Sequence, residues 1–248
     1  MKLKWLLIGV VLTGLVAAGG IWWWQSSQRA EVSDNSANTP PAFNKQQHSI
    51  DDPNSIWVIV NKLRPLPEDY QPDDLAVPNI KLNGSPLQEL MMLREPAAKA
   101  LEELSNGAKK AGLELILFSG YRPREYQKQL YDNYVALNGA AAADQFSARP
   151  GFSEHHTGLV ADLSGADGKC QAEKCFADKP EAQWLEAHAY EYGFILRYEE
   201  GKEAITGYKY EPWHIRYVGK ELAEEIHKTG QTLEEFFGLP PAPDYKPN

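Results

Sequence analysis

The sequence predicts an α+β domain over about residues 55–240, and three observations support this fold class. Short apolar runs of strand length mix irregularly with longer segments of helical periodicity, whereas strict alternation would indicate an α/β sheet. The length of 248 residues corresponds to one or two domains. The composition is 43% hydrophobic with 19 Gly, 17 Pro and 2 Cys, which excludes collagen, low-complexity disorder and a disulfide-rich miniprotein.

The N-terminal segment, residues 1–24, is predicted to be a signal anchor. Residues 5–24 are uncharged and follow Lys2 and Lys4. About 20 apolar residues suffice to span a bilayer as a helix, and the basic flank stays cytoplasmic. A cleaved signal peptide is the alternative, because the small residues at 17–20 could host a cleavage site. In both cases the rest of the chain lies outside the cytoplasm, where cysteines can oxidise.

Two further segments are expected to lie outside the folded domain. Residues 25–54 are polar, poor in aliphatic side chains and without a helical or strand period, so they predict a disordered linker. Residues 241–248 form the predicted C-terminal tail. Within the domain, apolar runs predict strands at 56–60, 113–118 and 158–163, and further strands or a hairpin at 193–198 and 206–218.

Caps and helix breakers delimit the predicted helices. The segment SPLQ at 85–88 has the pattern of a capping box with Pro at the first helical position, and Pro96 must end or kink the helix that it begins. Pro123 opens another helix that Gly139 stops. Apolar residues at 97, 101, 104 and 108 share one helical face, as do those at 126, 130, 134 and 137. Further helices are expected at 180–193 and 219–229, and a short one after Thr232.

The charge distribution limits the partners of this chain. The formal net charge is −9, and the first 30 residues carry +3, so the remainder carries −12. Proteins that bind nucleic acid present basic surfaces, which makes nucleic acid an unexpected partner. We expect a monomer.

Three of the six histidines are candidates for a site. His155 and His156 lie in the segment SEHHTGLVAD with Asp162, and His214 lies in EPWHIRY. One histidine, one aspartate and a distant second histidine leave a zinc ion a fourth position for water, as in catalytic zinc sites. Glu211, three residues before His214, could accept the proton of that water. The alternative is a structural core in which buried histidines bond to an aspartate. The other three are assigned to the linker (His48), a packed helical face (His188) and a charged surface (His227).

Three sequence blocks resemble the signature motifs of VanY-type D-alanyl-D-alanine carboxypeptidases, a zinc peptidase family that acts on bacterial cell-wall peptides. They are SGYRPREYQ at 119–127, RPGFSEHHTGLVAD at 149–162 and EPWHIRYVG at 211–219, and the segments at 60–75 and 184–198 also resemble the family, so the resemblance covers nearly all of 55–240. The resemblance implies ligation of one Zn²⁺ by His155, Asp162 and His214, with Glu211 as the catalytic base. His156 departs from the family, which usually has Gln there, and could offer an alternative ligand.

The resemblance also implies substrate contacts. Arg122 is similar to the family arginine that contacts the substrate carbonyl or its tetrahedral intermediate, while Gln127 and Ser153 match positions that line the pocket for the terminal D-residue. The residue types fit, because a planar guanidinium suits a carboxylate or an oxyanion. Trp213 could form a wall of this pocket or be a core aromatic residue. Arg122 could otherwise form a surface ion pair.

Other catalytic classes are excluded by their missing motifs. The chain contains no G-x-S-x-G and no Ser with Lys three positions later, so neither a serine hydrolase elbow nor the dyad of serine D,D-peptidases is present. Cys170 and Cys175 most simply form a disulfide that closes a small loop after Asp162, and a second metal site is the alternative.

The expected function is removal of the C-terminal D-alanine from peptidoglycan stem peptides by an enzyme anchored in the bacterial cell membrane, with its catalytic domain outside the cytoplasm. Two alternatives stay open. The first is an L,D-carboxypeptidase that trims tetrapeptide stems, because the family contains both activities. The second is a zinc-containing module that binds the wall without turnover, although a purely structural zinc needs no Glu211.

Overall fold

The computed structural model describes residues 43–83 and 87–246. The predicted anchor at 1–24, the first part of the predicted linker and two positions of the SPLQ cap lie outside the described residues. Among the residues that are described, no helix is long and apolar enough to cross a membrane.

A five-stranded sheet forms the centre of the domain and confirms the α+β class. Its spatial order is β2-β4-β5-β7-β6, with β2 parallel to β4 and every other pair antiparallel. A separate two-stranded sheet pairs β1 with β3. The strands are β1 (Leu75–Ala76), β2 (Lys81–Leu82), β3 (Leu93–Arg94), β4 (Leu115–Ser119), β5 (Val160–Gly165), β6 (Phe194–Leu196) and β7 (His214–Tyr217).

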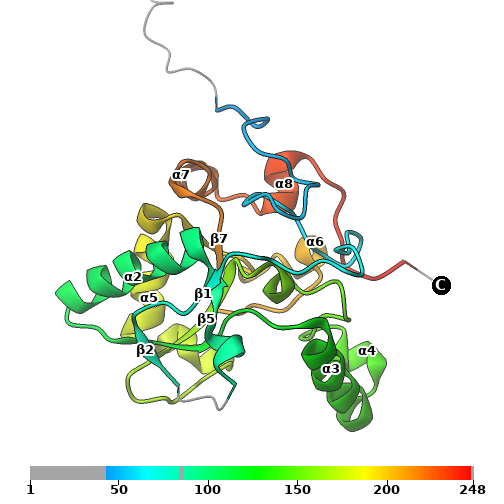
Figure 1. Cartoon of the computed structure of the whole chain (residues 1–248), viewed down its shortest axis with the longest axis horizontal. Helices are drawn as coiled ribbons and strands as arrows, with labels where there is room; N and C mark the ends of the chain where they lie inside the picture. The colour runs from blue at the N-terminus through cyan, green and yellow to red at the C-terminus, as the bar shows by residue number, and fades with distance from the viewer. Residues whose placement is uncertain (1–42, 84–86, 247–248) are drawn as a thin grey trace, which may run out of the picture. The chain divides into compact units, whose positions relative to one another are not determined.

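Helices flank the sheet in two groups. In Figure 1, α2 (Glu95–Lys110) and α5 (Pro180–His188) lie at the left, whereas α3 (Arg124–Asn138) and α4 (Ala140–Ala143) lie at the lower right. The predicted apolar face of α2 is confirmed, because its residues at 97, 101, 104 and 108 are fully buried in the core. The remaining helices are α6 (Glu203–Thr206), α7 (Lys220–Thr229) and α8 (Leu233–Phe237), with short 3₁₀ turns at η2 (Gln88–Met91), η3 (Glu154–Thr157), η4 (Lys174–Asp178) and η5 (Ala189–Tyr192).

Local helix signals are accurate in most places. Pro96 lies in the first turn of α2, Pro123 immediately precedes α3, and Gly139 ends α3 with a φ of 80°. The capping box of Thr232 with Glu235 begins α8. These positions depend on backbone geometry and neighbouring donors within one turn, which explains why the sequence reveals them.

The predicted strand at 56–60 is wrong. Residues 57–60 are buried, but they do not pair with a strand. The Arg216 guanidinium donates to the carbonyl oxygens of Ile56 and Val58 at 3.1 and 2.8 Å, and the Ile59 amide donates to the Ile50 carbonyl at 3.0 Å. An apolar run can therefore be buried without joining the sheet when a side chain satisfies its carbonyl groups.

The compact unit extends beyond the predicted domain at both ends. It begins at Asn44, within the predicted linker, where the Lys45 ammonium group lies over the Phe236 ring. Residues of the predicted tail also pack. Ala242 is fully buried, and the Tyr245 hydroxyl accepts a hydrogen bond from the Arg149 amide at 2.8 Å. Residues 44–54 and 241–246 therefore belong to the folded domain.

Candidate functional site

The sheet register brings the three predicted metal ligands together. Asp162 on β5 is paired directly with His214, the first residue of β7. His155 lies on η3, the turn that leads into β5. All three side chains are buried, and one ligand atom from each lies within 4.8 Å of the others. These are the only residues of the described part of the chain that form such a group.

His155 is oriented by a main-chain acceptor. Its Nδ1 lies 2.6 Å from the carbonyl oxygen of Gly120, which can only accept, so Nδ1 carries the proton. Nε2 then carries the lone pair, and it lies 3.3 Å from Asp162 Oδ2. Burial, together with the nearby Arg122 charge, lowers the pKa of His155 to about 4. The imidazole is therefore neutral, as a metal ligand must be.

His214 presents Nδ1 to the metal-ligand group, whereas His155 presents Nε2. Its Nδ1 lies 3.1 Å from Asp162 Oδ1, while Nε2 lies 3.8 Å from Oε2 of Glu154. Burial alone would lower the pKa of His214, but the carboxylates of Asp162 and Glu154 outweigh it and raise the pKa to about 9. Buried Asp162 Oδ1 has no hydrogen-bond partner among the described residues. A carboxylate that has one unsatisfied oxygen and lies close to an imidazole nitrogen of each histidine fits a zinc ion, which takes such N and O ligands.

Glu211 lies on the same side of the site as His214. The amide of His214 donates to the carbonyl of Glu211 at 3.1 Å, and this turn, which contains Pro212, places Glu211 Oε2 3.4 Å from His214 Nδ1. Burial raises the pKa of Glu211 to about 7, and the negative charge of Asp162 adds to this effect. A carboxyl group with a pKa near neutrality can both accept and donate a proton.

Arg122 reaches the metal-ligand group from the end of β4. Its Nη2 donates to Asp162 Oδ2 at 2.8 Å and lies 2.7 Å from His155 Nε2. Its Nε donates to Ser119 Oγ at 3.0 Å, and its Nη1 donates to Gln127 Oε1 at 3.2 Å. These bonds fix the plane of the guanidinium beside the predicted ligands, so the surface ion pair considered as an alternative is excluded.

The three remaining substrate contacts expected from the sequence divide into two kinds. Ser153 and Trp213 line the cleft around the metal-ligand group, and Ser153 Oγ also accepts from the amide of His155 at 3.3 Å. Gln127 is fully buried behind Arg122 and is absent from the cleft surface. Its Nε2 donates to the Ala148 carbonyl at 2.8 Å, so Gln127 supports Arg122 instead of lining the pocket.

His156 is not an alternative ligand in this structure. Its Nε2 accepts from the amide of Gly151 at 3.1 Å, and its Nδ1 donates to the carbonyl of Arg122 at 2.7 Å. Both ring nitrogens are therefore engaged by the main chain. The side chain ties the Arg122 backbone to the loop before η3, and burial lowers its pKa to about 4.

Sequence reasoning missed a buried charge cluster behind the site, which we call the Arg–Glu cluster. Glu154 Oε1 accepts from Arg197 Nε and Arg216 Nη1, each at 2.9 Å. Glu234 accepts two hydrogen bonds from Arg197, at 2.7 and 3.0 Å. Burial alone would raise the pKa of Glu154, but Arg197 and Arg216 hold it well below its usual range. The clue in the sequence is an arginine within each of two apolar strand segments, because a buried charge needs a partner.

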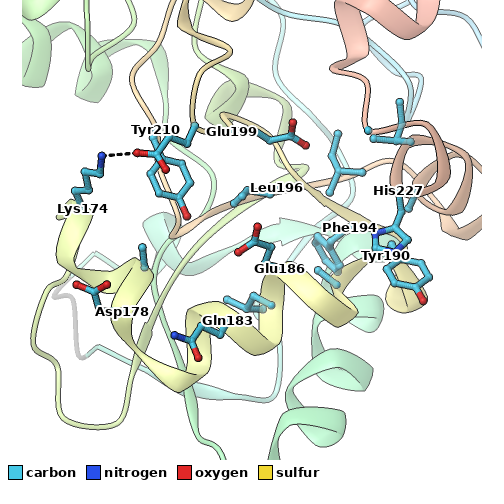
Figure 2. A pocket seen from close by; sticks show the side chains of 18 of the residues that line it. Lys174, Asp178, Gln183, Glu186, Tyr190, Phe194, Leu196, Glu199, Tyr210 and His227 are labelled. Carbon is cyan, nitrogen blue, oxygen red and sulfur yellow. Dashed lines mark hydrogen bonds and ion pairs between the residues drawn. The ribbon is translucent and has the colours of Figure 1, made fainter.

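Two large cavities border the sheet. The catalytic cleft, of about 860 Å³, contains the metal-ligand group together with Arg122 and Glu211. The second cavity, of about 910 Å³, lies between α5, β6 and α7, and Figure 2 shows Glu186, Glu199 and His227 along it. None of the predicted metal or catalytic residues lines this second cavity. The two cavities share Lys174 and Tyr210, which form a common wall.

The predicted disulfide is confirmed. Cys170 and Cys175 are bonded, and no free cysteine is found in the described part of the chain. The closed loop contributes Ala172 and Lys174 to the surface of the catalytic cleft. The disulfide therefore restrains one wall of the cleft, and the alternative of a second metal site at these cysteines is wrong.

Comparison with known proteins identifies the relatives of this chain. Residues 90–220 match the VanY family of D-alanyl-D-alanine carboxypeptidases. The Bacillus subtilis protein YodJ is 42% identical over 189 residues, which cover 76% of this chain and 69% of YodJ. The solved structure of the LdcB LD-carboxypeptidase superposes with a TM-score of 0.72 at 42% identity, covering 75% of this chain and 87% of that one.

A second solved structure bears on the metal. It is a mutant of the vancomycin resistance D,D-pentapeptidase VanY in complex with Zn(II), with a TM-score of 0.61 at 33% identity, covering 73% of this chain and 97% of that one. Each of the three blocks that resemble the family motifs contributes residues to the lining of the cleft. The chain therefore belongs to the VanY family of D-alanyl-D-alanine carboxypeptidases.

Proposed function

We propose that this chain is a zinc-dependent carboxypeptidase that removes the C-terminal D-alanine from peptidoglycan stem peptides. The observation that carries the proposal is the grouping of His155, Asp162 and His214 within 4.8 Å, with Glu211 beside them in an open cleft. A structural zinc site is closed by four protein ligands, whereas three ligands and an adjacent carboxylate are typical of hydrolytic sites. The family match and the zinc complex of a relative support it.

Each residue has a defined task in this proposal. His155 Nε2, Asp162 and His214 Nδ1 would hold the ion, which when bound acidifies a water molecule and polarises a carbonyl group. Glu211 accepts the proton from the attacking water and delivers it to the leaving amine, which its pKa of about 7 permits in both directions. Arg122 carries a fixed positive charge toward the oxygen on which negative charge develops.

Removal of D-alanine from pentapeptide stems is our first assignment, and trimming of tetrapeptide stems is the second. The family description and the VanY pentapeptidase favour the D,D reaction. The similarity to the LdcB LD-carboxypeptidase favours the L,D reaction. Both reactions release a C-terminal D-alanine and use the same groups, so the bond that is cut depends on the cleft walls. Product masses from penta- and tetrapeptide stems, with and without a chelator, distinguish them.

We also propose that the domain works outside the cytoplasm, held at the cell membrane by residues 5–24. The uncharged stretch behind Lys2 and Lys4 supports an anchor. The disulfide between Cys170 and Cys175 supports an oxidising compartment. Fractionation of cells into membrane and soluble parts, followed by protease treatment of intact protoplasts, tests both statements. Protection of the domain from the protease would contradict them.

The experiment that tests catalysis is Glu211→Gln. The amide keeps the size of the side chain but cannot accept a proton, so release of D-alanine should fall by at least about 100-fold. Zinc content should stay at one ion per chain, because Glu211 is not a predicted ligand. Full turnover in this variant would refute the mechanism. Binding of intact stem peptide by the unaltered chain without any cleavage would instead favour the non-catalytic wall-binding module.

A further inference from the structure

Helix α3 uses little of its apolar face to build the core, and Tyr126 is the one residue of that face that packs against it. Tyr126, Leu130, Tyr134 and Leu137 share that face, yet the only fully buried residue of α3 is Gln127. By contrast, α2 buries seven residues. Leu137 is 81% exposed. A helix of this length normally gains its stability by packing an apolar face on a neighbour, so this face needs another explanation.

The apolar face of α3 instead lines the catalytic cleft. Tyr126, Leu130 and Tyr134 share one cavity with the metal-ligand group. Phe146 joins them, because α4 folds the chain back along α3 and places the Phe146 ring 5.1 Å from that of Tyr134. We call these four residues the α3 wall. The wall contains no charged side chain and is continuous with the predicted reaction centre.

The turn that carries Phe146 is fixed by polar contacts. The Tyr131 hydroxyl donates to Asp144 Oδ1 at 2.8 Å, and Asp144 accepts two hydrogen bonds from Arg149, at 3.1 and 2.8 Å. The return of the chain after α4 is therefore determined by side chains outside the cleft. The α3 wall is a preformed surface that needs no rearrangement to receive a ligand.

The length of the wall sets the size of its ligand. Tyr126 and Tyr134 are eight residues apart, which corresponds to about 12 Å along a helix. An extended peptide advances about 3.3 Å per residue, so the wall can accommodate between three and four residues. The helix begins at Arg124, two residues after Arg122, so the wall starts beside the predicted reaction centre and leads away from it.

The side of the scissile bond that the α3 wall serves follows from the proposed reaction, on which this inference rests. A carboxypeptidase needs room for one residue on the leaving side of the scissile bond, and all other substrate residues lie on the opposite side. A wall long enough for several residues must therefore serve the opposite side. We propose that the α3 wall binds the stem-peptide residues that precede the scissile bond, and so favours long peptides over short ones.

The test compares two substrates on the zinc-loaded full-length chain. The first is whichever stem peptide, penta- or tetrapeptide, releases D-alanine. The second is its N-acetylated fragment with only the two residues that flank the scissile bond. Leu130→Ala should raise KM for the long peptide about tenfold, as expected for loss of most of a leucine contact, and leave kcat unchanged. It should leave kcat/KM for the short fragment unchanged.

Leu137→Ala is the matched control, since it makes the same change on the same helix outside the cleft. It should leave KM and kcat unchanged for both substrates. Equal effects of Leu130→Ala on both substrates, or no effect on either, would overturn the inference. Calorimetric binding of both peptides to Glu211→Gln, with and without Leu130→Ala, gives an answer independent of turnover. A different result separates the two proposals. If the unaltered chain cuts neither peptide, and the long peptide still binds about tenfold more weakly to the Leu130→Ala variant, the wall assignment stands and the proposed function fails.

Discussion

The carboxylate of Glu154 is predicted to hold the His214 imidazole in the tautomer that can bind metal. If His214 ligates through Nδ1, its Nε2 must carry the proton, and Glu154 Oε2, which has no other hydrogen-bond partner among the described residues, lies 3.8 Å from it. In Glu154→Gln, Oε1 would keep its two arginine donors while an amide NH₂ takes the position of Oε2. Two donors would then face each other, which favours a proton on Nδ1 and opposes ligation.

Two separate losses follow from this substitution. Loss of an outer partner of a ligating histidine typically weakens metal binding about 10- to 100-fold. The side chain of Glu154 is 0% exposed. Replacing its carboxylate by a neutral amide leaves the Arg–Glu cluster with an excess positive charge. Breaking a buried ion pair costs about 3–5 kcal/mol, and we expect about 3 kcal/mol because the amide keeps one acceptor.

The assay separates these two losses with a control variant. Zinc affinity is measured by competition with a chelator under conditions in which circular dichroism shows a folded domain, and the free energy of unfolding is measured in urea. Glu234→Gln removes the other carboxylate that pairs with Arg197 and does not face His214. It should lower stability by a similar amount and leave zinc affinity unchanged. Equal zinc affinities for Glu154→Gln and Glu234→Gln would refute the tautomer argument.

Three further predictions concern the site and its surroundings. Arg122→Met should lower kcat/KM for peptide by at least about 100-fold without weakening zinc binding, since Arg122 is not a ligand; weaker zinc binding in a chelator titration would contradict this. Zinc binding at pH 8 should release about one proton from His214, because its pKa is about 9 without metal while Glu211, with a pKa of about 7, is already ionised; this release from His214 should fall as the pH rises through 9, whereas a proton lost by zinc-bound water is released at high pH as well. Calorimetry in buffers of different ionisation enthalpy measures the number of protons released. Identical heats of zinc binding in all buffers would count against His214 as a ligand that loses a proton. Replacing Cys170 and Cys175 by Ser should lower the free energy of unfolding by about 2 kcal/mol, as expected for a loop this short, and spare zinc affinity. Urea unfolding measures this, and an unchanged midpoint would exclude a stabilising role for the disulfide.

The outcome for individual residues shows which inferences from sequence are accurate. The grouping of His155, Asp162 and His214 could be predicted because each lies in a motif whose residue types match zinc chemistry. The position of Gln127 could not be predicted, since burial behind Arg122 depends on how α3 packs after the Ser119–Arg122 turn. Likewise, only the contacts of Gly151 and Arg122 show that both nitrogens of His156 are engaged.

The sequence by itself determined the local features of this protein. Proline and glycine mark the ends of α2 and α3, Thr232 caps α8, and three motif blocks identify the family and predict the reactive side chains. These features depend on backbone conformation and residue chemistry within short segments, which a linear sequence records directly.

Only the tertiary structure decided the features that depend on contacts between distant segments. It shows the Arg–Glu cluster behind His214, the start of the compact unit at Asn44 and the exposure of the α3 wall to the cleft. Helical periodicity predicts that α3 has an apolar face, but the same pattern serves a core or a binding surface. Which of the two it serves is decided by the neighbours that the fold places opposite that face.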